Sequence, residues 1–211
     1  IQLFFSDIEP LAASKVLVRL ENETLSIGQR ILSQGLQLTV RGQDKIGIIG
    51  PNGVGKSTLL AKLHQLLSGK REISLGFMPQ DYQETLQLDL SPVEFLSQTG
   101  HKEEIQKIQS HLASLNFSYP EMHHQIHSLS GGQQGKLLLL NLVLRKPNFL
   151  LLDEPTRNFS PTSQPEIRKL FANYSGGLVT VSHDRRFLKE VCTSIYSLTE
   201  HGLEVVDLQD L

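Results

Sequence analysis

The sequence predicts an α/β fold in which a mostly parallel β-sheet is wrapped by helices. Short, uniformly apolar runs alternate along the chain with longer segments whose apolar residues recur at helical spacing. Such runs are typical of strands buried on both faces, and their alternation with helices is typical of a parallel sheet. The chain has 211 residues, of which 39% are apolar, so it is long enough to bury a core.

The N-terminal part predicts a linker followed by an antiparallel β-layer. Residues 1–14 are apolar and then acidic up to Pro10, so we expect a linker that leads into the domain. Residues 16–20 and 36–40 carry strand-like patterns, and the second alternates cleanly between apolar and polar side chains. We expect these strands to form a layer of their own.

The next stretch predicts a strand, a loop and a helix in close succession. Residues 45–49 form a short β-branched run that leads directly into glycines. Residues 56–67 then carry leucines at helical spacing, and a further strand is expected at residues 73–78.

A small helical subdomain is expected at residues 81–128. Ser91, Pro92 and Glu94 supply an N-cap, a proline at the first helical position and a glutamate three residues after the cap. The segment that follows is polar and mostly helical in pattern.

The last part of the chain predicts a helix followed by two buried strands. Ser130 opens a helix that extends through residue 144. Residues 149–152 are uniformly apolar and end in carboxylates, and residues 178–182 repeat the apolar pattern. Residues 15–80 and 129–211 are therefore expected to form the core of the domain.

Composition excludes several classes of protein. The net charge is −2 and no block of like charges occurs, so the chain gives no independent case for binding nucleic acid. Cys192 is the one cysteine, which agrees with a reducing, cytoplasmic location, and no apolar run reaches the roughly 18 residues that cross a bilayer. Because the chain starts at Ile1 rather than Met, we expect it to be a piece of a longer polypeptide.

A complete phosphate-binding motif follows the strand at residues 45–49. Residues 50–57 match the pattern G-x-x-x-x-G-K-[ST], with the required strand before it and helix after it. In such a loop the backbone N–H groups surround phosphates, Lys56 reaches the β and γ phosphates, and Ser57 ligates Mg²⁺. The expected nucleotide-binding residues are Gly50, Pro51, Asn52, Gly53, Val54, Gly55, Lys56, Ser57 and Thr58.

Two carboxylates end the buried strand at residues 149–152. The carboxyl ends of strands in open α/β sheets are the places where ligands bind. We expect Asp153 to hold Mg²⁺, and Glu154 to face the attacking water as general base or water-orienting group. The alternative is that this pair only caps the turn before Pro155.

A second anion-binding element is expected near residue 130. A serine followed by two glycines at a helix start offers free N–H groups to a phosphate. The expected residues are Ser130, Gly131, Gly132 and Gln133. Taken alone, the pattern is equally compatible with an N-cap followed by flexible glycines.

In combination, these motifs resemble the ATP-binding cassette (ABC) family of P-loop NTPases. Its phosphate loop is similar to residues 50–57, its signature to residues 129–133 and its magnesium strand to residues 150–154, in the same order. The resemblance extends to Gln80 and His183. It implies that the chain binds ATP with Mg²⁺ and pairs head to tail with a second cassette, in the same full-length chain or as a homodimer. The signature of one cassette would then close on the nucleotide of the other.

The resemblance implies roles for two further residues. Gln80 is similar to the glutamine that touches the metal and the attacking water, and His183 to the histidine that hydrogen-bonds the γ-phosphate. The expected catalytic residues are thus Glu154, His183 and Gln80, and the expected metal ligands are Ser57, Gln80 and Asp153. A glutamine in an ordinary turn and a structural histidine are the alternatives.

Two segments indicate the kind of cassette. Residues 182–188 resemble the switch segment of ABC-F proteins, which are soluble paired cassettes that act on ribosomes. Residues 157–160 replace the usual Asn-His-Leu-Asp with Arg-Asn-Phe-Ser, a variant that resembles the second cassette of antibiotic-resistance ABC-F proteins. This implies a ribosome partner, ribosome protection and no insertion into a membrane. Two alternatives stay open: the nucleotide-binding subunit of an ABC transporter, and a binding module with little catalysis, because Ser160 replaces the usual aspartate.

One departure concerns the adenine base. Cassettes of this family commonly stack an aromatic side chain on the base from the region of residues 25–30, where this chain offers only Ile27 or Leu25. Because stacking on an aromatic ring stabilises a bound base, we expect modest nucleotide affinity or weak base selectivity.

Overall fold

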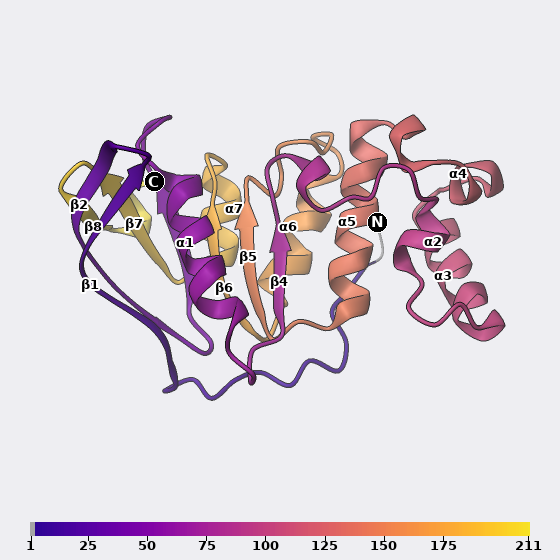
Figure 1. Cartoon of the computed structure of the whole chain (residues 1–211), viewed down its shortest axis with the longest axis horizontal. Helices are drawn as coiled ribbons and strands as arrows, with labels where there is room; N and C mark the ends of the chain where they lie inside the picture. Colours follow the sequence, from indigo (N-terminus) through magenta and orange to yellow (C-terminus); the bar gives the residue numbers. More distant parts are fainter. Residues whose placement is uncertain (1–2) are drawn as a thin grey trace.

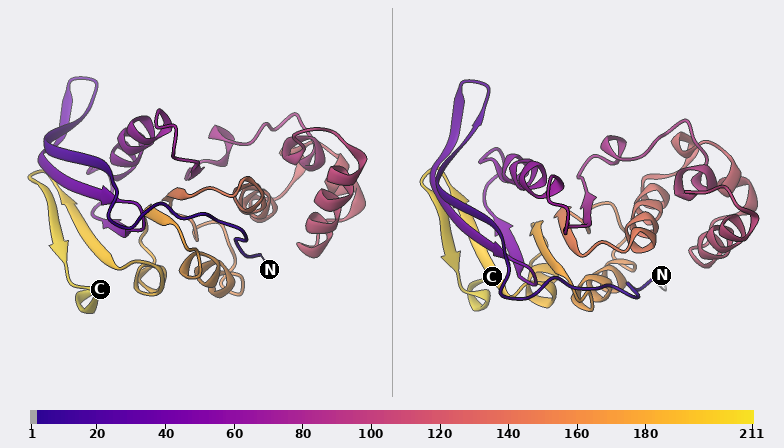
Figure 2. Two further views of the ribbon diagram at one scale, coloured as in Figure 1. Left: turned by 90° about the horizontal axis from the view of Figure 1, so that it is seen from below. Right: turned by 60° about the horizontal axis from the view of Figure 1, so that its bottom comes forward.

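The computed structural model describes residues 3–211, so residues 1 and 2 of the expected linker lie outside the described residues. Figures 1 and 2 show a large sheet with helices on both faces, a two-stranded ribbon at one end and a cluster of further helices at the other. The strands of the described residues are β1 (Val16–Ile27), β2 (Arg30–Arg41), β3 (Lys45–Ile49), β4 (Leu75–Met78), β5 (Phe149–Asp153), β6 (Gly177–Val181), β7 (Ser194–Thr199) and β8 (Gly202–Val206). Their helices are α1 (Lys56–Ser68), α2 (Pro92–Leu96), α3 (Lys102–Ser114), α4 (Tyr119–His123), α5 (Gly131–Arg145), α6 (Gln164–Ala172) and α7 (Arg185–Val191), with short 3-10 turns η1 (Tyr82–Glu84), η2 (Ile126–Ser128) and η3 (Leu208–Asp210).

The large sheet is mostly parallel. Its six described strands follow the order β4-β5-β6-β3-β7-β8, and only β7 and β8 pair in antiparallel fashion. The prediction of a mostly parallel sheet wrapped by helices, with a separate antiparallel β-layer, is confirmed. Because the parallel strands run in one direction, their carboxyl ends all lie at one edge of the sheet.

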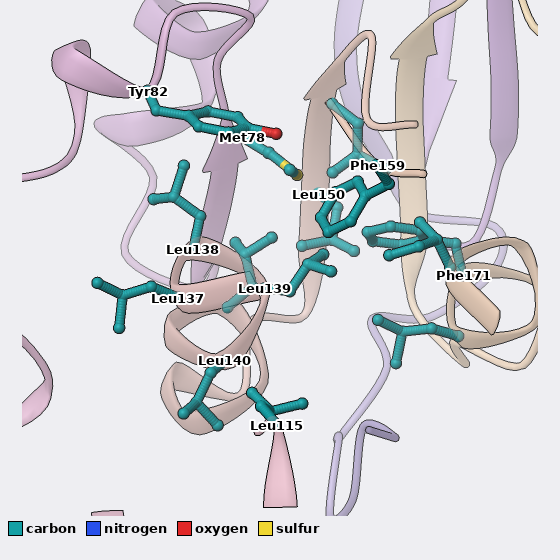
Figure 3. Close-up of a cluster of buried hydrophobic side chains, with 14 of the residues drawn as sticks. Met78, Tyr82, Leu115, Leu137, Leu138, Leu139, Leu140, Leu150, Phe159 and Phe171 are labelled. Carbon is teal, nitrogen blue, oxygen red and sulfur yellow. The ribbon is translucent and has the colours of Figure 1, made fainter. Parts of the chain in front are cut away.

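Two hydrophobic cores lie on opposite faces of this sheet. Side chains alternate between the faces of a strand, so Leu150 and Leu152 of β5 pack into one core and Leu151 packs into the other. The first core includes helices α2 to α7, and Figure 3 shows its part between α5 and the sheet. The second core includes α1 and the β1–β2 ribbon.

The ribbon is longer than the two expected strands. β1 and β2 pair in antiparallel fashion and turn at Gly28, whose φ of +58° favours glycine. Register shifts interrupt the pairing between Leu20 and Ser26, so the alternating pattern that identifies a strand is lost there. Ser33 fastens the ribbon to the sheet, because its Oγ donates to Thr199 O at 2.6 Å and accepts from Gly202 N at 3.1 Å.

Helices α2, α3 and α4 fill the stretch between β4 and α5. Ser91 caps α2 as expected: its Oγ accepts from Glu94 N at 3.3 Å, and the Glu94 carboxylate accepts from Ser91 N at 2.8 Å. A second capping box, at Ser118, begins α4. The boundaries of a subdomain at residues 81–128 stay a prediction.

Some elements differ from the expectation. The strand expected at residues 73–78 begins only at Leu75, because Ile73 closes a turn in which its N–H donates to Lys70 O. Elements α6, α7, β7 and β8 were not expected, since the two helices are short and only Gly202 of β8 is buried. Across residues 3–211, no helix combines the length and the apolar character that a membrane crossing requires.

Gly177 generates a prediction about packing, because three segments crowd together at the start of β6. A Cβ at this position would lie 2.5 Å from Phe149 Cε2 and 2.6 Å from Gly42 O. We expect Gly177→Ala to lower the free energy of unfolding by about 1–3 kcal/mol, as overpacking does in other cores. Urea unfolding measures this, with Gly69→Ala as control, since no described atom lies within 4 Å of a Cβ there. Equal stability of the two variants would contradict the packing argument.

Candidate functional site

A cavity of about 730 Å³ opens at the edge of the sheet where the parallel strands end. In Figure 1 this is the edge toward which the arrows of β4 and β5 point. Its walls come from the loops after β3, β4, β5 and β6, from the start of α1 and from the ribbon. The described lining residues are Ile27, Leu32, Asn52, Gly53, Gly55, Lys56, Ser57, Thr58, Gln80, Asp153, Glu154, Thr156, Arg157, Val181, His183 and Asp184.

The loop between β3 and α1 depends on glycine for its shape. Gly50 has φ +150°, and a Cβ there would lie 2.8 Å from Leu198 O. Gly55 has φ +110° at the N-cap of α1 and supplies no side-chain cap, so the first N–H groups of α1 are left for a ligand. Free N–H groups at the start of a long helix bind anions, and α1 has 13 residues.

Lys56 is folded over its own loop. Its Nζ donates to Gly50 O at 2.6 Å and to Pro51 O at 2.8 Å, and the residue is only 7% exposed. Burial lowers the pKa of Lys56, while the charges of Glu154 and Asp153 raise it. Because this ammonium group has lost most of its water, an anion in the cavity would stabilise its charged form.

Ser57 and Asp153 join the start of α1 to the end of β5. Ser57 Oγ donates to Asp153 Oδ2 at 2.7 Å, whereas the buried Asp153 Oδ1 has no hydrogen-bond partner among the described residues. Burial raises the pKa of Asp153, and the hydrogen bond from Ser57 and the charges of Lys56 and Arg157 offset part of that rise. A hydroxyl beside a carboxylate oxygen without a donor is a set of oxygen ligands that suits a hydrated Mg²⁺ ion.

Glu154 lies beside His183 in an unusual backbone conformation. Its φ is +50°, which few residues other than glycine adopt, and its N–H donates to Val181 O at 2.8 Å. The Glu154 carboxylate accepts from His183 N at 3.2 Å and lies 3.3 Å from His183 Nε2. Burial raises the pKa of Glu154, and His183 lowers it in part. A carboxylate with a raised pKa in a cavity is suited to accept a proton.

Gln80 is exposed in the loop after β4 and lines the same cavity as Ser57 and Asp153. It also lines a neighbouring cavity of about 700 Å³, whose wall includes Phe77 and Pro79. The structure therefore brings all three expected metal ligands to one place, with Gln80 where two cavities meet.

Several lining residues were not expected from the sequence. Thr156 Oγ1 donates to Asp184 Oδ2 at 3.1 Å, and Asp184 caps α7, so the segment after β5 is tied to the segment after β6. Each of these residues has an ordinary capping or turn pattern, which gives no signal of a site. Arg157 stands out in the sequence only as a departure from the usual family pattern.

The two candidates for contact with a base differ in exposure. Ile27 is 63% exposed and lines the cavity, together with Leu32. Leu25 is 2% exposed and is not among the described lining residues, so it is wrong as a candidate. A register shift between Leu25 and Ser26 separates the two positions, and the sequence gives no sign of that shift.

The structure does not bring the second anion-binding element into this cavity. Ser130 caps α5 in a capping box, in which its Oγ accepts from Gln133 N at 3.2 Å and its N–H donates to Gln133 Oε1 at 3.1 Å. Gln133 Nε2 also donates to Glu121 Oε1 at 2.6 Å. Ser130 and Gly131 are exposed, and none of the described residues 130–133 lines the cavity.

Comparison with known proteins agrees with this arrangement. Residues 33–157 match the family described as ABC transporter. "Probable ATP-binding protein YheS" of Escherichia coli strain K12 is 31% identical over 96% of this chain and 33% of its own length. "ABC transporter F family member 2" of Arabidopsis thaliana is 26% identical over 90% of this chain and 29% of its own length. The chain thus spans about a third of these relatives.

Solved structures share the fold. A dimeric structure of the ATP-binding cassette MJ0796 bound to ADP and Pi has a TM-score of 0.74 at 20% identity, covering 90% of this chain and 98% of that one. A bacterial Atm1-family ABC exporter with ATP bound has a TM-score of 0.75 at 16% identity, covering 99% of this chain and 42% of that one. These similarities confirm the predicted fold.

The buried carboxylate generates a prediction about stability. Burial raises the pKa of Asp153 in the folded chain, so its ionised form destabilises the fold at pH 7. Asp153→Asn keeps an oxygen for Ser57 Oγ and removes the charge. We therefore expect the variant to gain about 0.5–2 kcal/mol at pH 7 in urea unfolding without nucleotide or metal, a range common for stabilising substitutions.

The pH dependence of this gain in stability, together with a control variant, tests whether the buried charge of Asp153 is its cause. The gain should shrink as the pH falls through the raised folded pKa of Asp153 toward about 4, because the folded wild-type carboxyl takes up its proton over this range and no longer carries the buried charge. The exposed Glu103→Gln on α3 is the control and should stay within about 0.5 kcal/mol of wild type. A loss of stability in Asp153→Asn at pH 7 would contradict the assignment.

Proposed function

The chain belongs to the ABC transporter family, whose cassettes are ATPases, and we propose that it is one cassette of a protein that binds and hydrolyses ATP with Mg²⁺. The observation that carries this proposal is the Ser57–Asp153 pair beside the phosphate-binding loop. Asp153 Oδ1 is buried there without a hydrogen-bond partner among the described residues. The pair therefore fits a cation that binds together with a phosphate group.

The phosphate-binding loop and α1 would bind the phosphates. Backbone N–H groups of residues 50–58 would donate to the phosphate oxygens, which would also replace the loop carbonyls as partners of Lys56 Nζ. Ile27 and Leu32 would offer an apolar surface to the base.

Ser57, Gln80 and Asp153 would hold Mg²⁺. When bound, the ion neutralises charge that develops on the phosphate oxygens. The oxygen ligands and the cavity around them leave room for the waters that Mg²⁺ usually keeps.

Glu154 and His183 would act on the attacking water and on the γ-phosphate. Glu154 would accept a proton from the attacking water while the water oxygen forms a bond to the γ-phosphorus. The bond between that phosphorus and the oxygen that bridges it to the β-phosphate breaks, which releases ADP and phosphate. His183 would donate a hydrogen bond to a γ-phosphate oxygen. To do so, its ring has to move away from the Glu154 carboxylate, which it now contacts at 3.3 Å. The raised pKa of Glu154 favours the proton transfer.

A second cassette would complete each site. Ser130–Gln133 are kept apart from the cavity of their own chain but carry the exposed N-terminus of α5, which has 15 residues. A head-to-tail partner, in the same full-length chain or in a homodimer, would place this element on the nucleotide bound by the other cassette. The similarity to the dimeric cassette MJ0796 supports this pairing.

Within the family, we favour a cytoplasmic ABC-F protein that acts on the ribosome. The similarity to "ABC transporter F family member 2" and the ABC-F-like residues 182–188 support this assignment. The chain would be the second cassette of an antibiotic-resistance, ribosome-protection member, with residues 15–80 and 129–211 as nucleotide-binding core and residues 81–128 as helical subdomain. Co-sedimentation of the full-length protein with ribosomes, in ATP and not in ADP, tests the partner.

The alternative is the nucleotide-binding subunit of an ABC transporter. Its supporting observation is the second cavity beside Gln80, where a membrane partner would dock. The full-length gene distinguishes the two. A second cassette joined by a charged helical linker supports ABC-F, and a fused or neighbouring membrane domain supports transport.

Glu154→Gln tests the hydrolytic role. Removal of the proton acceptor should reduce ATP turnover by about 100-fold or more, while the Kd for ATP with Mg²⁺ stays within about threefold, because the carboxylate is not among the proposed phosphate contacts. Steady-state phosphate release and calorimetry measure the two quantities, and gel filtration should show a trapped ATP-bound dimer. Glu103→Gln is the control and should turn over ATP like wild type. Turnover at the wild-type rate in Glu154→Gln would contradict the role of Glu154 as proton acceptor.

Base selectivity tests the proposed place of the adenine. With Ile27 in place of an aromatic side chain, the Kd values for ATP and GTP should differ by less than about tenfold. Ile27→Phe should tighten ATP binding by about 1–3 kcal/mol through stacking. Ile31→Phe is the matched control, since Ile31 is 55% exposed on the same ribbon but is not among the described lining residues. Submicromolar ATP binding with GTP rejected tenfold would contradict this prediction.

A further inference from the structure

Arg157 occupies an unusual place beside the proposed metal ligands. It lines both the 730 Å³ cavity and the neighbouring 700 Å³ cavity, and it shares this position with Ser57, Thr58, Gln80 and Asp153. Its backbone N–H donates to Glu154 O at 3.1 Å, so a turn fixes the position of the residue whatever its side chain. Arg157 therefore lies beside the cavities that Ser57, Gln80 and Asp153 also line, and its charge acts on the Asp153 carboxylate.

Three other charged groups of the cavity already have partners. Lys56 Nζ donates to two carbonyls, Glu154 contacts His183, and Asp184 caps α7 and accepts from Thr156. The guanidinium of Arg157, by contrast, makes no hydrogen bond within residues 3–211; its one described interaction is the electrostatic one with Asp153, and the residue is exposed. A permanently charged side chain whose N–H groups are not engaged in hydrogen bonds can donate them to an anion.

A guanidinium group in this position has two physical effects. It presents several N–H donors to phosphate oxygens, and charge-assisted bonds of this kind are among the stronger hydrogen bonds. It also interacts with the Asp153 carboxylate, whose pKa it helps to lower against the effect of burial, and it repels a second cation. The first effect reduces the share of the phosphate charge that a metal ion has to neutralise, and the second makes binding of the metal ion beside Asp153 less favourable.

We propose that Arg157 is a second phosphate-binding cation of this site and that it makes ATP binding less dependent on Mg²⁺. This inference rests on the proposed function, since it concerns the same nucleotide and metal. It predicts that the chain retains measurable affinity for metal-free ATP, and that this affinity depends on the charge at residue 157.

The test compares the Kd for ATP in Mg²⁺ with the Kd in excess EDTA, by isothermal titration calorimetry on the chain. Arg157→Gln removes the charge at similar size, and Arg157→Lys retains it. Arg71→Gln is the matched control, because Arg71 is exposed beyond the far end of α1, about 20 Å from the loop at its start. Arg157 is exposed, so its variants should melt at the wild-type temperature.

The expected result is a change in one ratio. Kd in EDTA divided by Kd in Mg²⁺ should rise about tenfold in Arg157→Gln, the loss expected for a charged hydrogen bond, and should stay near wild type in Arg157→Lys and Arg71→Gln. An unchanged ratio in Arg157→Gln, or an equal rise in Arg157→Lys, would overturn the proposal. If the wild-type chain does not bind ATP in Mg²⁺, the proposed function itself fails, which is a separate outcome.

Discussion

The register of three neighbouring strands is the constraint on which the candidate site depends. Val181 of β6 is paired with Ile48 of β3 on one side and with Asp153 of β5 on the other. The phosphate-binding loop therefore begins two residues beyond the row that holds Asp153, and Ser57 Oγ reaches Asp153 Oδ2 at 2.7 Å. A shift of one residue in either pairing would reverse the faces on which side chains of β3 and β5 lie relative to each other, and would break this contact.

The buried charges and the backbone conformation of the site lower the stability of the fold, and burial of apolar side chains in the two cores offsets this loss. Burial disfavours the ionised carboxylates of Asp153 and Glu154, and Glu154 adopts φ +50°. Immediately before them, Leu150, Leu151 and Leu152 are fully buried, with alternate side chains in opposite cores. Because side chains on both faces of β5 are buried in a core, the backbone at its carboxyl end is held in this strained conformation. An isolated turn would relax out of it.

Local signals explain which parts could be predicted from the sequence. The capping boxes at Ser91 and Ser130 and the glycines around Lys56 act within a few residues, so the printed sequence contains the whole interaction. Features that depend on contacts distant in sequence were not accessible in this way. The length of the ribbon depends on bulges and on Ser33 bonding to Thr199, and the choice of Ile27 over Leu25 depends on a register shift.

The two anion-binding elements lie apart in the fold but are connected by a packing contact between residues distant in sequence. Ser130 begins α5, and Gly135, one turn later, packs so closely that a Cβ would lie 2.9 Å from Phe159 Cζ and 3.0 Å from Tyr82 Oη. Tyr82 follows Gln80 in the chain, and Phe159 follows the segment that carries Glu154. Since close-packed side chains transmit displacement rather than absorb it, a movement of α5 has to displace both segments. The exposed helix start is therefore connected by packing to the segments that carry Gln80 and Glu154, although none of the described residues 130–133 lines the cavity.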